Sequence, residues 1–311
     1  MAANDVRSPV GWRVVGSQGG HESSMLVLVG SAIVIVCVFG GYIASGGHIG
    51  VLIQPFEVVI IGGAAFGAFV ISNTKTVLKA SFKALLGLLK APKHNKATFL
   101  ELLTLLYAVF KLAQMKGMLA LEQHVENPHE STLFKQFPKF NGDEHAVTFM
   151  CDYLRLLTLG SDKAHEMEAL MDEEIQTHHQ DQLEISEAVN KIAEGTPALG
   201  IVAAVLGVIH TMGSINEPPE VLGHLIGAAL VGTFLGVLLS YGFIGPMANA
   251  IKGRANTDTK YFTCMKAGLL AYMQGYAPAV AVEFARKMLY AHERPSFYEV
   301  EEAVQALPAP T

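Results

Sequence analysis

The sequence predicts an all-α membrane protein, with four transmembrane helices in two hairpins plus a helical cytoplasmic domain. Residues 195–216 and 221–251 contain no Asp, Glu, Lys or Arg. Each run is longer than the ~20 apolar residues that cross a bilayer as a helix. Residues 25–45 are also free of charge, and residues 51–72 carry a single acid, Glu57. Only 16% of all residues are charged and 51% are hydrophobic, which fits membrane spans joined to a soluble part.

The distribution of Lys and Arg orients these spans. Residues 1–24 hold two of them, residues 73–192 hold 13 and residues 249–311 hold seven, which accounts for all 22 in the chain. The short connections inside the two hairpins, near residues 46–50 and 214–220, hold none. Because Lys and Arg concentrate in cytoplasmic loops, both termini and the large middle segment are expected to be cytoplasmic.

The membrane segments and the leader follow from the same pattern. Residues 25–72 are expected to form the first and second transmembrane helices, and residues 193–248 the third and fourth. Residues 1–24 are polar, rich in Gly and Ser and without periodicity, which predicts a disordered cytoplasmic leader. Alternatively, Met25 is the true start of the protein.

Residues 73–192 are predicted to form a cytoplasmic helical domain. Apolar residues recur there at the three-to-four spacing of an amphipathic helix in ATFLELLTLLYAVFKLAQ and VTFMCDYLRLLTLG. Residues 249–311 are expected to form two further cytoplasmic helices, separated by a break at GYAP, and a tail. No stretch of any length favours β-strands.

Small residues recur every fourth position in the predicted spans. A spacing of four places them on one helix face, where a neighbouring backbone can approach closely. Such a face ordinarily indicates packing within one four-helix protein, and the alternative is packing against another chain. The residues are Gly63 and Gly67 in the second span, and Gly223, Gly227, Gly232, Gly236 and Ser240 in the fourth.

Two prolines, Pro197 and Pro246, lie at the predicted cytoplasmic ends of the third and fourth spans. A proline removes a backbone donor and can kink a helix. Simple helix punctuation explains either proline alone. Two prolines at the same depth in adjacent spans favour a hinge that couples the membrane part to the cytoplasmic domain.

Polar groups inside the spans are few, and no acid is expected at mid-span. His210, His224 and Glu57 are expected near the outer ends, and the interior polar groups are hydroxyls such as Thr233 and Ser240. Ion transport normally requires a buried acid or base that faces a cavity. The sequence therefore favours a protein that borrows a carboxylate from a partner's helix over a stand-alone transporter.

No enzyme signature is present. The chain has no Walker loop, dinucleotide fingerprint or nucleophile elbow. No metal site is predicted, because the adjacent His178 and His179 would point ~100° apart on a helix and the three cysteines lack metal-ligand spacing. Neither a cofactor nor a nucleic-acid partner is expected.

Several longer motifs are distinctive together. They are GGYIASGG, QPFEVVII, LEQHVENPHES, DYLRL, EALMDEEIQTH, TPALGIVAAVLGVIHTMGS, LVGTFLGVLLSYGFIGP, GYAPAVAVEFARK and ERPSFYEVEE. Through them the chain from Met25 to about Leu307 resembles the motility protein A family of flagellar motor stators. The wider relatives that energise outer-membrane transport share the last two spans but not this layout or the ERPSF tail.

The resemblance implies a function in motility and chemotaxis. It implies a multi-pass protein of the bacterial inner membrane, in which five copies ring a dimer of the stator partner, motility protein B. This partner is a single-span, peptidoglycan-binding protein that supplies the ion-binding aspartate. Ion flow would turn the five-membered ring, and the ring would turn the rotor through its switch protein.

The resemblance also assigns roles to particular residues. Thr233 matches the polar residue of the ion path beside the partner's aspartate. Pro197 and Pro246 match the two prolines with a coupling role. Glu122 matches a charged residue that contacts the rotor, and Glu174 matches a functional acid of the cytoplasmic domain.

One departure from the family concerns the rotor contact. Gln114 stands where the family has an arginine, so Lys111 or Lys116 is expected to supply the charge. Lys111 precedes Glu122 by eleven residues, which is only ~20° off the same face if the helix is continuous. Gly117 lies between them and can break that helix.

Ala204 bears on the transported ion. It stands where sodium-driven relatives have a threonine, and an alanine cannot coordinate sodium. Protons are therefore the expected transported ion. The competing prediction is an ion-driven energiser of another envelope machine, for outer-membrane uptake or gliding.

Overall fold

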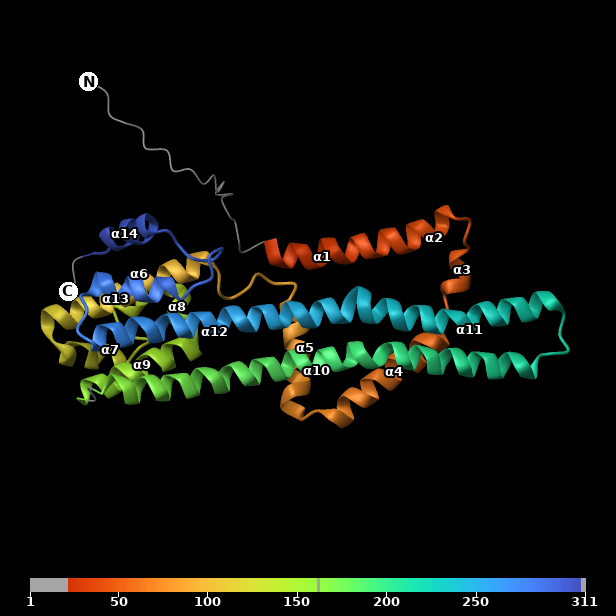
Figure 1. Ribbon diagram of the computed structural model, residues 1–311, viewed down its shortest axis with the longest axis horizontal. Coiled ribbons are helices and arrows are strands. Elements are labelled where there is room, and N and C mark those ends of the chain that lie inside the picture. The colour runs from red at the N-terminus through yellow and green to blue at the C-terminus, as the bar shows by residue number, and fades with distance from the viewer. Residues whose placement is uncertain (1–21, 161–162, 309–311) are drawn as a thin grey trace, which may run out of the picture.

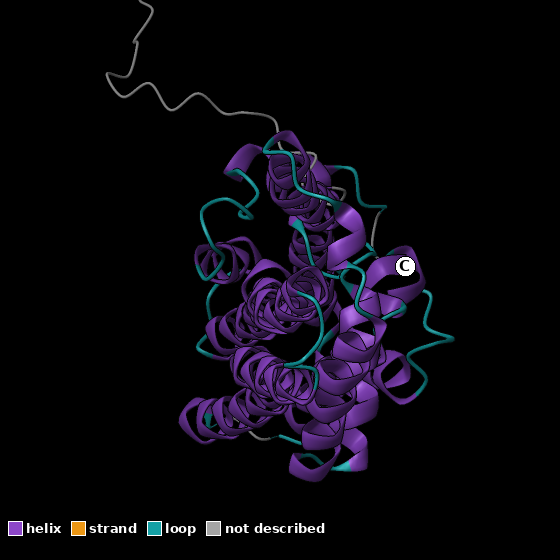
Figure 2. Cartoon of the chain, turned by 90° about the vertical axis from the view of Figure 1, so that its right-hand side faces the viewer, coloured by secondary structure: helices purple, strands orange, loops and turns teal. Residues whose placement is uncertain are grey.

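The computed structural model describes residues 22–160 and 163–308, and within them every regular element is a helix (Figure 2). The all-α prediction is confirmed. The predicted leader, residues 1–24, lies outside the described residues except for 22–24, which begin the first helix.

The N-terminal hairpin is built from short and long helical pieces. α1 (Glu22–Ile35), the π-helical turn η1 (Val36–Gly40) and α2 (Gly41–Ala44) form one continuous run. After a turn in which Gly46 has a φ of +87°, α3 (Ile49–Leu52) and α4 (Pro55–Ser72) return. α4 packs on the long helix α10, whereas α1 makes few contacts with the rest of the chain (Figure 1).

Two long antiparallel helical rods form the axis of the molecule (Figure 1). The first is α10 (Ala164–Gly213), a single helix of 50 residues, which at 1.5 Å per residue is about 75 Å long. The second runs through α11 (Pro219–Leu239), the π-helical turn η4 (Ser240–Ile244) and α12 (Gly245–Met273). The helices of the third and fourth predicted spans therefore continue well beyond those spans, to residues 164 and 273, without a break.

A helical domain surrounds the end of the rods that lies away from the α10–α11 turn (Figure 1). Its central helix is α6 (Lys96–Lys116), which begins at an Asn95 capping box and packs against α12, α13 and α14. α5 (Lys75–Gly87) crosses the two rods and joins this domain to α4. The other helices of the domain are η2 (Met118–Leu121), α7 (Glu122–Glu126), η3 (Phe134–Gln136), α8 (Pro138–Asn141), α9 (Glu144–Thr158), α13 (Pro278–Lys287) and α14 (Phe297–Gln305).

The C-terminal segment differs from its prediction. After α12, it holds α13 and also α14, where the sequence analysis expected two helices, separated at GYAP, and then a tail. Ser296 and Glu299 form a capping box that starts α14. This local signal specifies one more helix, and Val300 packs that helix on the core.

Five helical stretches are long and apolar enough to cross a membrane. They are Met25–Ala44, Ile49–Ser72, Lys96–Lys116, Ala164–Gly213 and Pro219–Met273. The third of them is α6, which the protein's own helices bury, whereas the first two expose most of their apolar side chains. A multi-pass membrane protein is thus supported by the fold.

Candidate functional site

α10 and α11 cross with their backbones in direct contact, and glycine makes this possible. A Cβ atom on Gly200 would lie 2.8 Å from the carbonyl oxygen of Gly232, and one on Gly236 would lie 2.9 Å from the Cα of Gly200. Gly232 and Gly236 therefore pack within one chain. By contrast, a Cβ on Gly63 or Gly67 of α4 would meet nothing within 4 Å.

The two residues predicted for the ion path lie at similar positions along the crossing helices. A Cβ on Gly232 would lie 3.2 Å from the backbone nitrogen of Ala204. Thr233 follows Gly232 directly, so Thr233 on α11 and Ala204 on α10 lie at one level of the crossing. Both side chains are partly buried.

An acid that the sequence analysis expected at the outer boundary also reaches this crossing. A Cβ on Gly232 would lie 2.7 Å from Oε2 of Glu57, which is in the first turn of α4. Glu57 reaches the interior of α11 because the α10–α11 hairpin extends farther than the α2–α3 connection (Figure 1). The signal in the sequence was that Glu57 is the one acid between residues 25 and 72.

Pro197 lies inside α10 and does not end a helix. Because proline has no N–H, the carbonyl of Ala193 loses its helical donor. Ser240 Oγ donates to this carbonyl oxygen at 2.6 Å. Ser240 is buried and begins the π-helical turn η4 on the other rod.

Pro246 lies in the first turn of α12, directly after η4. It also does not end the helical rod, which runs on to Met273. A π-helical turn is a frequent irregularity at functional positions of helices. Each proline therefore lies close to one end of the Ser240 hydrogen bond. Pro197 is four residues after the acceptor, Ala193 of α10, and Pro246 follows η4, which contains the donor.

The predicted rotor contact does not lie on one continuous helix. α6 ends at Lys116, and Gly117 has a φ of +85°, a backbone conformation that favours glycine. Glu122 then begins the separate helix α7. Lys111 and Glu122 therefore do not share a face of one helix, and of the two possibilities that the sequence left open, the break at Gly117 is the one observed.

The two candidate lysines lie in different surroundings. Lys111 is partly buried, with Nζ 5.5 Å from the centre of the Tyr107 ring. Lys116 is exposed. It lies close enough to His124 of α7 for its positive charge, after burial, to lower the pKa of that histidine. Gln114 and Glu122 are exposed as well. The end of α6 and α7 form the far end of the helical domain, opposite the α10–α11 turn (Figure 1).

Glu174 is an exposed residue of α10 with a defined partner. The Tyr153 hydroxyl of α9 donates to Glu174 Oε2 at 2.6 Å. Burial, and then this hydrogen bond, raise the pKa of Tyr153. The carboxylate of Glu174 therefore ties α9 to α10.

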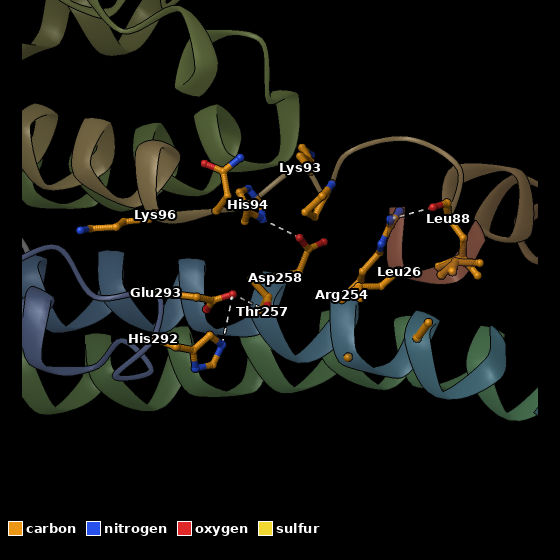
Figure 3. A pocket seen from close by; sticks show the side chains of 15 residues that line it. Leu26, Leu88, Lys93, His94, Lys96, Arg254, Thr257, Asp258, His292 and Glu293 are labelled. Atoms are coloured by element: carbon orange, nitrogen blue, oxygen red, sulfur yellow. Dashed lines mark hydrogen bonds and ion pairs between the residues drawn. The ribbon is translucent and has the colours of Figure 1, made fainter. Parts of the chain in front are cut away.

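A buried ion cluster in the helical domain escaped the sequence analysis. His94 Nδ1 lies 2.5 Å from Asp258 and its Nε2 lies 3.1 Å from Asp143, while Lys93 binds Asp143 at 2.8 Å. The His94 ring also stacks on Tyr261, with ring centres 4.0 Å apart. The cluster fastens the α5–α6 connection to Asp143 at the start of α9 and to Asp258 of α12, and Figure 3 shows the bond between His94 and Asp258. Nothing local in the sequence marks these residues, which lie far apart along the chain.

The electrostatics of this cluster follow from its geometry. Burial alone lowers the pKa of His94, but hydrogen bonds to Asp143 and Asp258 outweigh burial and raise it. The pKa of Asp143 is depressed, because its bonds to His94 and Lys93 outweigh its burial. The geometry of the cluster therefore favours the protonated form of His94 and the ionised form of Asp143.

Beside the cluster, Arg254 of α12 fastens the end of α5. Its guanidinium donates to the carbonyl oxygens of Gly87 at 2.6 Å and Lys90 at 2.8 Å. Figure 3 shows it beside Leu88, on the wall of a 370 Å³ cavity that His94 and Asp258 also line. These contacts hold the α5–α6 connection against the second rod.

The chain matches known families and proteins over nearly its whole length. Residues 28–117 match the Motility protein A N-terminal family, and residues 143–263 match the MotA/TolQ/ExbB proton channel family. Motility protein A of Salmonella typhimurium is 46% identical over 286 residues, covering 92% of this chain and 97% of the relative. Motility protein A of Escherichia coli is 45% identical with the same coverage.

Solved structures share the fold. A structure of C. jejuni MotAB matches with a TM-score of 0.74 at 20% identity, covering 88% of this chain and 98% of that one. The flagellar MotAB stator complex from Bacillus subtilis matches with a TM-score of 0.63 at 25% identity, over 82% and 92%. By the identity and coverage of its relatives, this chain belongs to the motility protein A family of flagellar motor stators.

Proposed function

We propose that this protein is a proton-driven stator component of a bacterial flagellar motor. Together with motility protein B, it forms a proton channel whose ion flow rotates a ring of copies of this chain and applies torque to the rotor. The observation that carries this proposal is the similarity to motility protein A over 97% of the relative's length. The crossing of α10 and α11, where Gly232, the neighbour of Thr233, packs against Ala204, is consistent with this site.

The proposed arrangement in the membrane has four spans and a cytoplasmic helical domain. Of the five apolar stretches, α6 is left out because the helices of its own domain bury it. The spans then lie in the segments 25–72 and 193–248, with both termini in the cytoplasm and the protein in the inner membrane. Alkaline phosphatase fused within residues 214–217 should be active, and fused within residues 127–130 it should be inactive.

The proposed partner supplies the carboxylate of the ion path. Motility protein B, a single-span protein, would place its aspartate at the level of Thr233, and five copies of this chain would surround a dimer of it. The open faces of Gly63 and Gly67 are consistent with packing between neighbouring copies. Ala204 offers no oxygen ligand for sodium, so protons are the proposed ion. No other cofactor is proposed.

The proposed rotor contact lies at the far end of the helical domain. Glu122 and Lys116 are both exposed there and close in sequence to the chain reversal at Gly117. Lys111 is directed to the Tyr107 ring instead, and Gln114 contributes no charge. Because a surface ion pair contributes only ~0–1 kcal/mol, torque transfer to the switch protein would be shared among several charges.

A second candidate is an ion-driven energiser of another envelope machine. The match of residues 143–263 to a family that includes TolQ and ExbB favours it. The match of residues 28–117 to the motility protein A N-terminal family favours the motor.

Swimming of a deletion strain separates the two candidates. The strain would carry this gene alone, and then together with a candidate gene for motility protein B, in sodium-free and in sodium-rich medium. Motility that needs both genes, survives replacement of sodium by potassium and stops with a protonophore supports the motor. Unchanged swimming of the deletion strain would favour the energiser, and sodium-dependent torque would exclude proton drive.

A further inference from the structure

Glu57 is the acid of the first hairpin that meets the α10–α11 crossing. Its Oε2 is shielded from solvent and has no hydrogen-bond partner among the described residues, while the residue as a whole is only partly buried. Buried polar oxygens nearly always have a partner, and leaving one without a partner costs free energy. A purely structural role would therefore not explain why this carboxyl oxygen is shielded from solvent without a hydrogen-bond partner.

The space that receives the carboxyl group exists because of a glycine. A Cβ on Gly232 would lie 2.7 Å from Oε2 of Glu57 and 3.0 Å from the Cβ of Ala203. Any larger residue at position 232 would displace the carboxyl group from the crossing. Gly232 thus has two functions: it lets α10 and α11 approach, and it admits an acid from α4.

The level of this contact matches the proposed ion path. Gly232 precedes Thr233, and the Cβ position of Gly232 lies 3.2 Å from the nitrogen of Ala204. Glu57 itself is in the first turn of α4, on the side of the outer hairpin connections. One side chain therefore links the outer end of the second span to the level of Thr233.

We infer that Glu57 is a proton-carrying residue of the ion path, positioned between the outer side and the acceptor at the level of Thr233. This inference rests on the proposed function. A hydronium ion from the outer side transfers a proton to the Glu57 carboxylate and is left as water. The neutral acid then releases that proton to the partner's carboxylate, the Glu57 carboxylate is restored, and no electron is transferred. An acid inside a membrane segment is a functional group by default.

The test compares Glu57→Gln with Glu57→Asp in a motile strain that also expresses motility protein B. Glu57→Gln keeps the shape of the side chain but cannot carry a proton, whereas Glu57→Asp can. The speed of the unloaded motor, which depends on the rate of proton delivery, is expected to fall at least about tenfold in Glu57→Gln. Stall torque should fall much less, and Glu57→Asp should recover most of the speed.

Glu220→Gln is the matched control, because Glu220 is an exposed acid in the first turn of α11. It should leave unloaded speed and stall torque unchanged. Unchanged unloaded speed in Glu57→Gln, at equal protein in the membrane, would overturn the inference. An equal loss of speed and stall torque in Glu57→Gln and Glu57→Asp, or loss of the protein from the membrane in both, would assign Glu57 a structural role and overturn it as well.

A second measurement does not depend on motor activity. Dicyclohexylcarbodiimide modifies protonated carboxyl groups in apolar surroundings, and mass spectrometry locates the adduct. Membranes that contain the protein should show the adduct at Glu57 and none at Glu220, and an unmodified Glu57 would contradict the inference. If the wild-type gene together with motility protein B supports no motility, the proposed function fails, and this labelling alone decides the role of Glu57.

Discussion

Ser240 Oγ donates its hydrogen bond to the carbonyl oxygen of Ala193, the group that Pro197 leaves without a helical donor. The donor and the acceptor belong to different rods, so the missing bond inside α10 is replaced by a bond between α10 and η4. Nearer the helical domain, a second bond of the same kind joins the rods, from Ser186 Oγ to the carbonyl of Ala248 at 2.9 Å. The position of Pro197 in α10 is thereby linked to η4 by a hydrogen bond.

Replacement of Ser240 by Ala should weaken this coupling. The carbonyl of Ala193 would be buried without a donor, at a cost of about 1–3 kcal/mol. We expect a lower melting temperature of the purified complex and lower torque. The Pro197→Ala background provides the sharper measurement, because an alanine restores the N–H that binds Ala193 within α10. In that background the Ser240→Ala cost should largely disappear.

Ser45→Ala is the control for loss of a hydroxyl, because Ser45 also donates to a backbone carbonyl, that of Tyr42 at 2.8 Å, but is exposed. It should change neither the melting temperature nor torque measurably. Equal costs of Ser240→Ala with and without Pro197 would show that the two residues act independently and would refute the coupling.

The His94 cluster makes the stability of the helical domain depend on pH. The pKa of His94 is raised in the folded protein. Its contribution is therefore fully present below the unfolded pKa of about 6.5 and is lost as pH rises through the folded pKa. The pKa of Asp143 is depressed, so its contribution is lost only as pH falls below about 3.9, toward its folded pKa.

His94→Gln should therefore be most costly at mildly acidic pH. Breaking a buried ion pair costs about 3–5 kcal/mol, so thermal unfolding at pH 6 should shift clearly downwards, and the shift should shrink toward pH 9. His129→Gln serves as control, since His129 is exposed. A shift that is the same at pH 6 and pH 9 would mean that the charge of His94 contributes nothing.

The two candidate lysines of the rotor contact should behave differently. Lys116→Glu reverses an exposed charge beside α7, and we expect a few-fold loss of stall torque at most, because single surface pairs contribute ~0–1 kcal/mol. Lys111→Glu places an acid over the Tyr107 ring, where a cation is favoured. That variant should lower the melting temperature of the domain instead.

The combination of Lys116→Glu with Glu122→Lys tests whether the two charges contact one rotor surface. Partial recovery of torque over Lys116→Glu alone would support a shared contact. If Lys111→Glu abolished torque with an unchanged melting temperature, the rotor contact would have to be reassigned to Lys111.

The sequence predicted what depends on local pattern. Charge-free runs located the apolar helices, and three-to-four spacing located α6 and α9 at almost their observed bounds. A break of the helix at Gly117 was one of the two possibilities that the sequence left open, because glycine permits the positive φ that the chain adopts there. The last helix was missed although Ser296 and Glu299 carry a capping-box signature.

Contacts between distant segments could not be predicted in this way. The position of Glu57 beside Gly232 depends on how far the α10–α11 hairpin extends past α4. No local sequence pattern encodes that length. The pairing of His94 with Asp258 spans 164 positions, and the Ser240 bond exists only because the rods are in register. The prolines were recognised, but their surroundings required the structure.

The hydroxyl of Thr233 offers the most direct test of the ion path. Thr233→Val keeps the branched shape and removes the hydroxyl, so the protein should still assemble with motility protein B. Proton uptake by cells that express both proteins should fall at least about tenfold, since a positioned proton-transfer group contributes about 10²-fold or more. Thr211→Val is the matched control, because the Thr211 hydroxyl binds the carbonyl of Gly207 in its own helix, at 2.9 Å. Full proton uptake in Thr233→Val would show that Thr233 is not part of the ion path. Equal losses in Thr233→Val and Thr211→Val would show that both hydroxyls act only through helix packing.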